Sequence, residues 1–384
     1  TPTEQPDDTP SPTETATSAE TETETETESP TATPMGELTA WPTFRYDAAN
    51  TGTSPATGVT DSDVTGVWRS SLGEESQSSP AIVDGTVYVG YNEGFLAVNA
   101  ATGERIWRTE NIQVPDSSPA VDGNTVYIGT DGQRSIGMRA FDATTGERQW
   151  ATEIGGIRSS PTVVDGTVYV GTKNGFVLAL DAESGETQWR HSDNGSFNTT
   201  PAVVGEMVYI GNSDGSIIAL NTEDGKQQWS YGTTAAVNSS PAVVGNRVYV
   251  GSNDRYVYAL NREDGSRVWR FSTLSAVQSS PAVAGGSVYI GSNDRYFYAL
   301  NAADGTQQWQ YDANERVQSS PAVANGFVYV GIGNSRIVAL NAADGNQRWS
   351  FRTEDTVTAS PAVTDGMVFI TDRNGFLHAI AADE

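Results

Sequence analysis

The chain has 384 residues and a net charge of −26, which disfavours binding to nucleic acids and to anionic membrane surfaces. It contains no cysteine and two histidines, so it has no disulfides, thiolate metal sites or cysteine nucleophile, and a histidine-built metal centre is disfavoured. Only Lys173 and Lys226 are lysines. Acid-rich, lysine-poor composition predicts a halophilic source, and a merely acidic secreted protein is the alternative.

Residues 1–34 consist mainly of Thr, Pro and acidic residues, with no basic residue. Such a segment cannot bury enough apolar surface to offset the entropy of ordering, so residues 1–40 are predicted to be a disordered linker. The chain starts at Thr1, and no apolar run approaches the roughly 18 residues of a membrane span. These features predict a processed, extracytoplasmic protein, secreted or at the cell surface, with the linker as its anchor and the only route to a membrane.

From residue 64 onward the sequence repeats itself, after a lead-in segment at residues 41–63. The repeat is marked by two small residues followed by proline, at Pro80, Pro119, Pro161, Pro201, Pro241, Pro281, Pro321 and Pro361. The spacings are 39, 42 and then five times 40 residues. A fixed period of this length indicates a solenoid, a propeller or another repeat array.

Each copy predicts four short strands separated by Gly, Asn and Asp turns. One copy has them at 279–283, 287–291, 296–301 and 307–309. Eight such copies predict an all-β fold, an eight-bladed β-propeller of four-stranded blades over residues 64–384. The last copy lacks its Trp, whereas an unpaired Trp68 precedes the first proline. The strand at 64–71 is therefore predicted to complete the last blade and close the ring.

Ala, Gly and Trp recur at positions 1, 7 and 11 of an eleven-residue stretch, as in Ala97, Gly103 and Trp107. This pattern resembles the tryptophan-docking motif of the quinoprotein (PQQ-like) β-propeller repeat family. The resemblance covers about 320 of the 384 residues and implies that each indole lies between blades as a structural contact. The docking residues are Trp68, Trp107, Trp150, Trp189, Trp229, Trp269, Trp309 and Trp349. The stretch 41–47 also looks like the family's lead-in, which lies across the disc.

Two branches of this family have different functions. The PQQ-dependent dehydrogenases carry a vicinal cysteine pair, calcium-ligating Glu and Asn residues, a catalytic Asp and long insertions. Here Ser78 and Ser79 stand at the comparable place, the copies stay near 40 residues, and only the second copy is enlarged, near 131–137. The chain therefore looks closest to the non-catalytic BamB-like propeller lipoproteins. No catalytic residue, no metal and no cofactor is expected; PQQ and calcium are both disfavoured.

The best candidate site appears when the copies are aligned on the proline. The residue before the two small residues lies where the innermost strands begin, so eight polar side chains are predicted to meet at the mouth of the central channel. They are Gln77, Asp116, Arg158, Asn198, Asn238, Gln278, Gln318 and Thr358. On the same face the later copies place Arg255, Arg295, Arg336 and Arg373. The structural alternative is that these are solvated turns and strand ends.

Other local patterns are explained by turns. The stretch 211–215 fits the nucleophile-elbow pattern, but equivalent positions in other copies are hairpin turns. The recurring Asp-Gly pairs also suit turns, and no calcium-loop spacing follows them. Asn194, Asn198 and Asn238 begin N-x-Ser/Thr sequons, so glycosylation is an open alternative.

These observations predict a monomeric, non-catalytic binding or scaffold propeller, tethered to the cell surface. It is expected to bind a protein, a peptide or an anionic ligand of the cell envelope at the arginine-bearing channel mouth, because the planar guanidinium can hold carboxylates and carbonyls in two hydrogen bonds. The alternatives are a PQQ-dependent quinoprotein dehydrogenase and an extracytoplasmic sensor or polysaccharide-binding module.

Overall fold

The computed structural model describes residues 38–114, 116–132 and 135–383. The chain divides into two units, residues 1–34 and 35–384. The predicted linker at residues 1–40 lies almost wholly outside the described residues. The described residues form strands and turns, and they include no helix that could serve as a membrane span.

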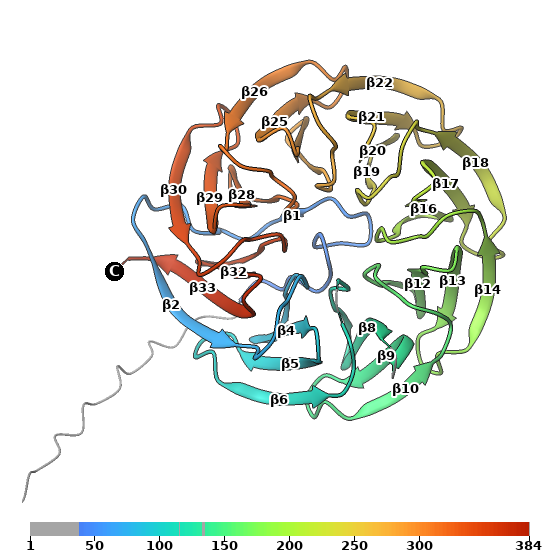
Figure 1. Ribbon diagram of the computed structural model, residues 1–384, viewed down its shortest axis with the longest axis horizontal. Helices are drawn as coiled ribbons and strands as arrows, with labels where there is room; N and C mark the ends of the chain where they lie inside the picture. Colours follow the sequence, from blue (N-terminus) through green and yellow to red (C-terminus); the bar gives the residue numbers. More distant parts are fainter. Residues whose placement is uncertain (1–37, 115, 133–134, 384) are drawn as a thin grey trace, which may run out of the picture. The chain divides into compact units, whose positions relative to one another are not determined.

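Eight sheets surround a central channel in the unit 35–384, as Figure 1 shows. From the channel outward, blades 1 to 4 consist of β3 (Ala81–Val83), β4 (Thr86–Tyr91), β5 (Gly94–Asn99), β6 (Arg105–Glu110); β7 (Ala120–Asp122), β8 (Thr125–Gly132), β9 (Ser135–Asp142), β10 (Arg148–Thr152); β11 (Thr162–Val164), β12 (Thr167–Gly171), β13 (Phe176–Asp181), β14 (Thr187–Ser192); β15 (Ala202–Val204), β16 (Met207–Gly211), β17 (Ser216–Asn221) and β18 (Gln227–Gly232).

Blades 5 to 8 follow the same order. They consist of β19 (Ala242–Val244), β20 (Arg247–Gly251), β21 (Tyr256–Asn261), β22 (Arg267–Ser272); β23 (Ala282–Ala284), β24 (Ser287–Gly291), β25 (Tyr296–Asn301), β26 (Gln307–Asp312); β27 (Ala322–Ala324), β28 (Phe327–Ile332), β29 (Arg336–Asn341), β30 (Gln347–Arg352); β31 (Ala362–Thr364), β32 (Met367–Thr371), β33 (Phe376–Ala382) and β2 (Val64–Ser71). A short strand, β1 (Thr53–Ser54), pairs in parallel with β27.

The ring is closed by the strand that the unpaired Trp68 predicted. Strand β2 pairs antiparallel with β33, from Val64 opposite Ala382 to Ser71 opposite Phe376, and becomes the outer strand of blade 8. The predicted eight-bladed, all-β propeller is therefore confirmed, with its closure. The first and last parts of the repeat share one sheet, so no blade is left with an incomplete edge.

Burial explains the composition of the strands. The second and third strands of each blade, such as β16 and β17, are buried on both faces because a neighbouring blade covers each face, and they read as continuous apolar runs. The outer strands bury mainly the tryptophan, as in β18, where Trp229 is buried between exposed residues. The core is thus a circle of inter-blade clusters.

Each tryptophan joins its blade to the next. The indole N–H of Trp309 donates to the carbonyl of Ala342 in blade 7 (3.0 Å), and the hydroxyl of Tyr289 donates to the same carbonyl (3.0 Å). The ring lies against Gly345, where an added Cβ would come within 2.6 Å of the indole. Gly345 also has a φ of +74°, so this position suits glycine for two reasons. Loss of one such indole is expected to cost roughly 3–5 kcal/mol.

The docking bond is present at all eight tryptophans of the blades. The indole N–H groups of Trp68, Trp107, Trp150, Trp189, Trp229, Trp269, Trp309 and Trp349 donate over 2.7–3.0 Å. The acceptor of Trp349 is the carbonyl of Val59 in the lead-in segment, which also accepts from Tyr329 (3.1 Å). The lead-in therefore supplies the docking carbonyl between blades 7 and 8.

The lead-in segment closes one end of the channel, and Figure 1 shows it in blue across the middle of the ring. Amides of the innermost strands donate to its carbonyls, as Val203 does to Ala48 (2.6 Å) and Val283 to Thr51 (3.0 Å). The buried side chain of Arg45 donates to the carbonyls of Pro281 and Pro321. The segment thus satisfies strand edges that would otherwise be unpaired.

We expect residues 1–37 and residues 38–72 to differ in their contribution to stability. Removing residues 1–37 should leave the thermal midpoint nearly unchanged. Removing residues 1–72 should strongly destabilise the protein and promote aggregation, because it deletes β2, the lead-in and the Trp68 contact. Thermal unfolding and light scattering of both truncated proteins would measure this. Equal midpoints for the two truncations would contradict the closure by β2.

Candidate functional site

A blind pit of about 160 Å³ occupies the channel end opposite the lead-in. Phe44 of the lead-in contributes to its lining from below. Seven of the eight predicted mouth positions also line it: Gln77, Asp116, Arg158, Asn198, Asn238, Gln278 and Thr358. Gln318 joins the same rim, because its Nε2 donates to Oε1 of Gln278 (2.7 Å). Residues about 40 positions apart are thus brought together. Whether they bind a ligand stays a prediction.

Beneath this rim, the second small residue of each landmark forms a ring of hydroxyls. We call Ser79, Ser118, Ser160, Thr200, Ser240, Ser280, Ser320 and Ser360 the hydroxyl ring; all eight are buried and line the pit. At seven described positions the backbone amide donates to the hydroxyl oxygen of the next blade, as Ser240 does to Ser280 (2.9 Å). The bond from Ser360 to Ser79 (2.9 Å) joins the last blade to the first.

The first small residue has a different role within its own blade. The hydroxyl of Ser78 accepts from the amide of Gly90 (3.1 Å), and Ser239 accepts from Gly251 (2.9 Å). These two hydrogen-bonding roles explain why the landmark contains small hydroxyl residues. In the sequence alone, these small residues serve only to mark the repeat.

An ion-pair network lies at the rim between blades 2 and 3. Arg158 pairs with Asp116 (3.2 Å) and Asp131 (2.8 Å), and Lys173 also pairs with Asp131 (2.9 Å). Burial raises the pKa of Asp116, with Arg158 opposing it. Burial also acts to raise the pKa of Asp131, but the hydrogen bonds from Arg158 and Lys173 outweigh it and lower that pKa. The network ties these two blades together on the mouth face.

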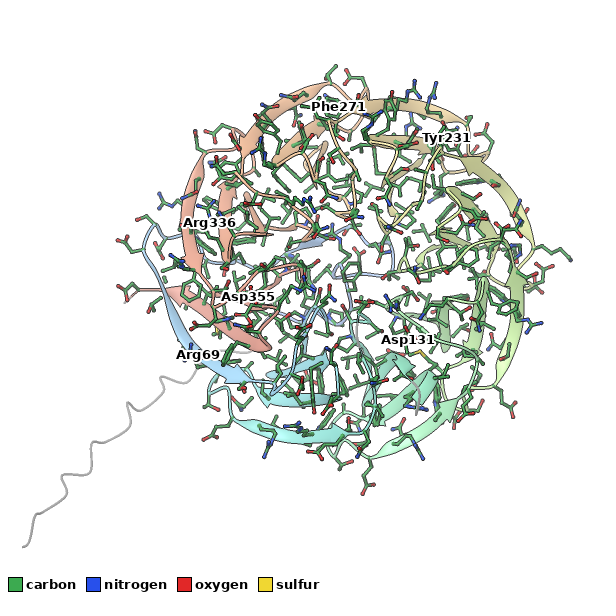
Figure 2. All side chains as sticks on the ribbon, viewed as in Figure 1. Arg69, Asp131, Tyr231, Phe271, Arg336 and Asp355 are labelled. Atoms are coloured by element: carbon green, nitrogen blue, oxygen red, sulfur yellow. The ribbon has the colours of Figure 1, made fainter. Side chains whose placement is uncertain are left out.

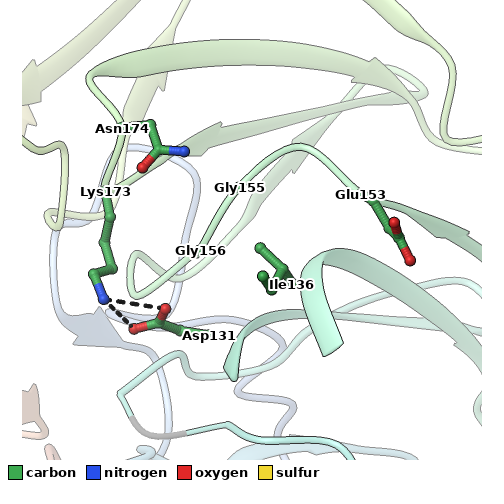
Figure 3. A pocket seen from close by; sticks show the side chains of 7 residues that line it. All are labelled: Asp131, Ile136, Glu153, Gly155, Gly156, Lys173 and Asn174. Carbon is green, nitrogen blue, oxygen red and sulfur yellow. Dashed lines mark hydrogen bonds and ion pairs between the residues drawn. The ribbon is translucent and has the colours of Figure 1, made fainter. Parts of the chain in front are cut away.

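The enlarged second copy forms a second cavity beside this network. Its extra residues lengthen the hairpin of β8 and β9 to eight residues per strand, where β12 has five. The cavity, about 440 Å³, is shown in Figure 3 with Lys173 and Asp131 paired at one side and Glu153 at the other. Gly155 and Gly156 lie between them and leave the space open.

The four predicted rim arginines have different surroundings. Arg255 and Arg295 are exposed and, among the described residues, their side chains have no hydrogen-bond or ion-pair partner. Arg373 is exposed and close enough to Asp116 to act on its pKa. Arg336 instead donates to Asn334 (3.0 Å) and to the carbonyl of Ala313 (3.3 Å). Figure 2 shows Arg336 on blade 7, away from the centre of the ring.

Sequence reasoning missed an apolar residue between the two free arginines. Leu274 is 79% exposed, the most exposed large apolar side chain among the described residues. Its amide donates to the carboxylate of Asp294 (2.9 Å), which precedes Arg295, and the amide of Thr273 donates to the carbonyl of Arg255 (2.9 Å). We call Arg255, Leu274 and Arg295 the Arg–Leu–Arg surface. Alignment of the copies could have revealed Leu274, because the equivalent positions in four other blades are polar. They are Asn194, Thr234, Asn314 and Glu354.

The three sequons lie on the same face as the pit. Asn194, Asn198 and Asn238 are exposed, and the last two line the pit. Glycosylation at these positions stays a prediction.

Ser78 and Ser79 stand where the PQQ-dependent dehydrogenases carry their cysteine pair. They do not fit a site made from paired cysteines and calcium. Ser78 and Ser79 are buried and hold the blade and its neighbour together through their hydroxyls. Within the described ranges, no group of three or more acidic or histidine side chains could hold a metal ion. We therefore derive no chemical step through these residues.

These features define a β-propeller of eight tryptophan-docked blades with a channel closed at one end. The profile of the family described as Outer membrane protein assembly factor BamB matches residues 54–150, 135–250, 232–320 and 312–384. The chain belongs to this PQQ-like propeller family. A search of curated proteins finds no match.

Solved structures share the fold at low identity. The BamB structure from Moraxella catarrhalis is 20% identical, with a TM-score of 0.71 over 84% of this chain and 98% of the other. The quinohemoprotein alcohol dehydrogenase from Comamonas testosteroni is 16% identical, with a TM-score of 0.76 over 90% and 81% of the two chains. A europium-containing methanol dehydrogenase is 14% identical, with a TM-score of 0.74 over 89% and 98%. The neighbours thus include BamB and dehydrogenases, and they establish the fold alone.

We expect the hydroxyl ring to contribute directly to stability. Ser240→Ala removes the acceptor of the buried Thr200 amide and should cost about 1–3 kcal/mol in the free energy of unfolding. Chemical denaturation would measure the loss. Ser230→Ala, on the exposed side of β18, is the matched control and should change stability by less than about 0.5 kcal/mol. Equal effects of both substitutions would argue against a structural role for the ring.

Proposed function

We propose that this protein is a non-catalytic scaffold of the cell envelope that binds an acidic protein or peptide on the mouth face of its propeller. The observation that carries the proposal is the Arg–Leu–Arg surface. Two exposed arginines without partners among the described residues flank an apolar side chain that is 79% exposed. An apolar anchor with adjacent arginines is a common composition for the centre of a protein interface.

The backbone supports a role beyond folding for both arginines. Arg255 and Arg295 have φ values of 74° and 79°, in the left-handed region that favours glycine. The equivalent positions Gly175, Gly215 and Gly375 hold glycine with positive φ, and the equivalent position in blade 7 holds Ser335 with a φ of 61°. A non-glycine residue there costs roughly 1–2 kcal/mol. Because the turn forms with glycine in other blades, this cost has no evident structural benefit.

Among the described residues, neither arginine forms an ion pair with the carboxylate beside it. Asp254, next to Arg255, accepts hydrogen bonds from Tyr258 (2.7 Å) and from the amide of Thr234 (3.1 Å). Asp294, next to Arg295, accepts from Tyr298 (2.9 Å) and from the amide of Leu274 (2.9 Å). The guanidinium groups remain available to a partner. In a chain of net charge −26, two exposed guanidinium groups without an ion-pair partner among the described residues favour an acidic partner that also offers an apolar side chain.

We also propose that the protein works without PQQ and calcium, outside the cytoplasm, as a monomeric propeller. The hydrogen bonds of Ser78 and Ser79 support the first point, since both hydroxyls are used to hold blades. The family match and the acidic N-terminal sequence support an envelope location. A quinoprotein dehydrogenase is the main alternative, because such enzymes share the fold.

Replacing both arginines by glycine should separate binding from folding. The Arg255→Gly/Arg295→Gly variant should be as stable as the native protein or more stable, by about 1 kcal/mol per site, because the backbone strain is relieved. Its affinity for the partner should fall by about tenfold or more. A photo-cross-linking residue at position 274 would first capture the partner from native envelope. Calorimetry with the purified partner would then give affinities, and thermal unfolding would give stabilities.

The matched control lies on the opposite face. Glu223→Gln/Glu263→Gln removes two exposed turn charges and should leave the affinity unchanged. Unchanged affinity of the glycine variant, or loss of affinity in the control alone, would show that the partner binds elsewhere.

Quinone chemistry is expected to be absent. Purified protein mixed with PQQ and calcium should show no saturable heat of binding and no alcohol-dependent or sugar-dependent dye reduction. Calorimetry and a dye-reduction assay would test this. Micromolar affinity for PQQ would favour the dehydrogenase alternative.

A further inference from the structure

We propose that the blind pit is a binding site for a small anion, of the size of a halide ion or a single carboxylate group. The proposal concerns the floor and walls of the pit and does not depend on the Arg–Leu–Arg surface. It rests on three features of the described residues: the unused protons of the hydroxyl ring, the buried charge of Arg45 and the size of the cavity.

The hydroxyl ring presents a circle of hydrogen-bond donors. At seven positions the hydroxyl oxygen already accepts a hydrogen bond from a backbone amide. The proton of each of these hydroxyl groups is still available for donation. Among the described residues, none of the eight hydroxyls donates to a protein atom. All eight line the pit. A buried ring of hydroxyl donors without protein acceptors is suited to an electron-rich guest.

Arg45 adds positive charge next to this ring, although it is not one of the residues that line the pit. Its side chain is buried and donates to the carbonyls of Pro281 and Pro321, the residues directly after Ser280 and Ser320 of the ring. No carboxylate among the described residues forms an ion pair with it, and its Nε has no partner there. Burial lowers the pKa of Arg45 to about 9, with Asp47 opposing the shift, so the group remains charged at neutral pH. A buried cation without an ion-pair partner favours an anion nearby.

The same features disfavour a cation in the pit. The amide dipoles of the ring point at the hydroxyl oxygens and occupy lone pairs that would otherwise ligate a metal. Arg45 would repel a cation from below. The only carboxylate that lines the pit, Asp116, is already paired with Arg158. At about 160 Å³, the cavity has room for a halide ion and a few waters, since one water occupies about 30 Å³ of liquid.

Crystals of the full chain grown in rubidium bromide would test the sign of the guest. Anomalous diffraction at the bromine and rubidium absorption edges distinguishes the two ions. We expect a bromide peak inside the hydroxyl ring. Rubidium in the pit would overturn the proposal. So would water alone in the pit with bromide confined to exterior arginines, which would be an adventitious ion only.

Anion binding to the pit can also be measured in solution, without a crystal. The chlorine-35 NMR line of sodium chloride should broaden with the native protein, and sodium acetate should reverse the broadening if a carboxylate competes for the pit. Arg45→Gln should weaken chloride binding by about tenfold or more, and Arg45→Lys should retain most of it. Arg69→Gln removes an exposed arginine of β2 and serves as the control. If the Arg45 variants do not fold, the bromide and acetate results for the native chain still decide the question. The proposal would be contradicted if the native chain did not broaden the chloride line. It would also be contradicted if Arg69→Gln removed the broadening and Arg45→Gln did not.

Discussion

The structure depends on one shared acceptor between each pair of blades. A backbone carbonyl after the third strand receives an indole N–H and, at most blades, a tyrosine hydroxyl from the preceding blade, as the carbonyl of Ala302 does from Trp269 and Tyr249. Two donors on one carbonyl fix the distance and the angle between neighbouring blades, and the adjacent glycine lets the indole lie against the backbone. This geometry recurs at seven interfaces, and between blades 7 and 8 the carbonyl of Val59 in the lead-in takes the same place. The blades therefore close into a circle, which places the inner strands around one channel.

Closing one end of that channel makes the two faces of the propeller different. The lead-in occupies the inner strand edges on one side, and Arg45 is buried there with its charge. On the other side the inner strands begin with small hydroxyl residues and polar rim residues, so the channel ends in a pit open at that face. The lead-in therefore contributes to stability and at the same time defines the face on which binding is proposed.

Three departures from the repeat lie on this mouth face. Arginine replaces glycine at two left-handed turns, leucine replaces a polar residue at the loop between them, and the second blade carries a longer hairpin with its own ion pairs. In an array of near-identical blades, the common positions are explained by packing and the exceptions are not. The proposal of a binding face depends on these exceptions more than on the shared polar rim.

The sequence by itself determined the propeller, the number of blades, the closing strand and the docking tryptophans. It also predicted that the rim residues from Gln77 to Thr358 meet, because a fixed period places equivalent residues at equivalent points of a circle. Only the tertiary structure decided the roles of residues whose contacts differ from one copy of the repeat to the next. Arg336 is held back on its blade by Asn334, Leu274 lies between two arginines from different blades, and Arg45 is buried under the hydroxyl ring. These contacts join segments with no shared period, so their geometry exists only once the ring has closed around the lead-in.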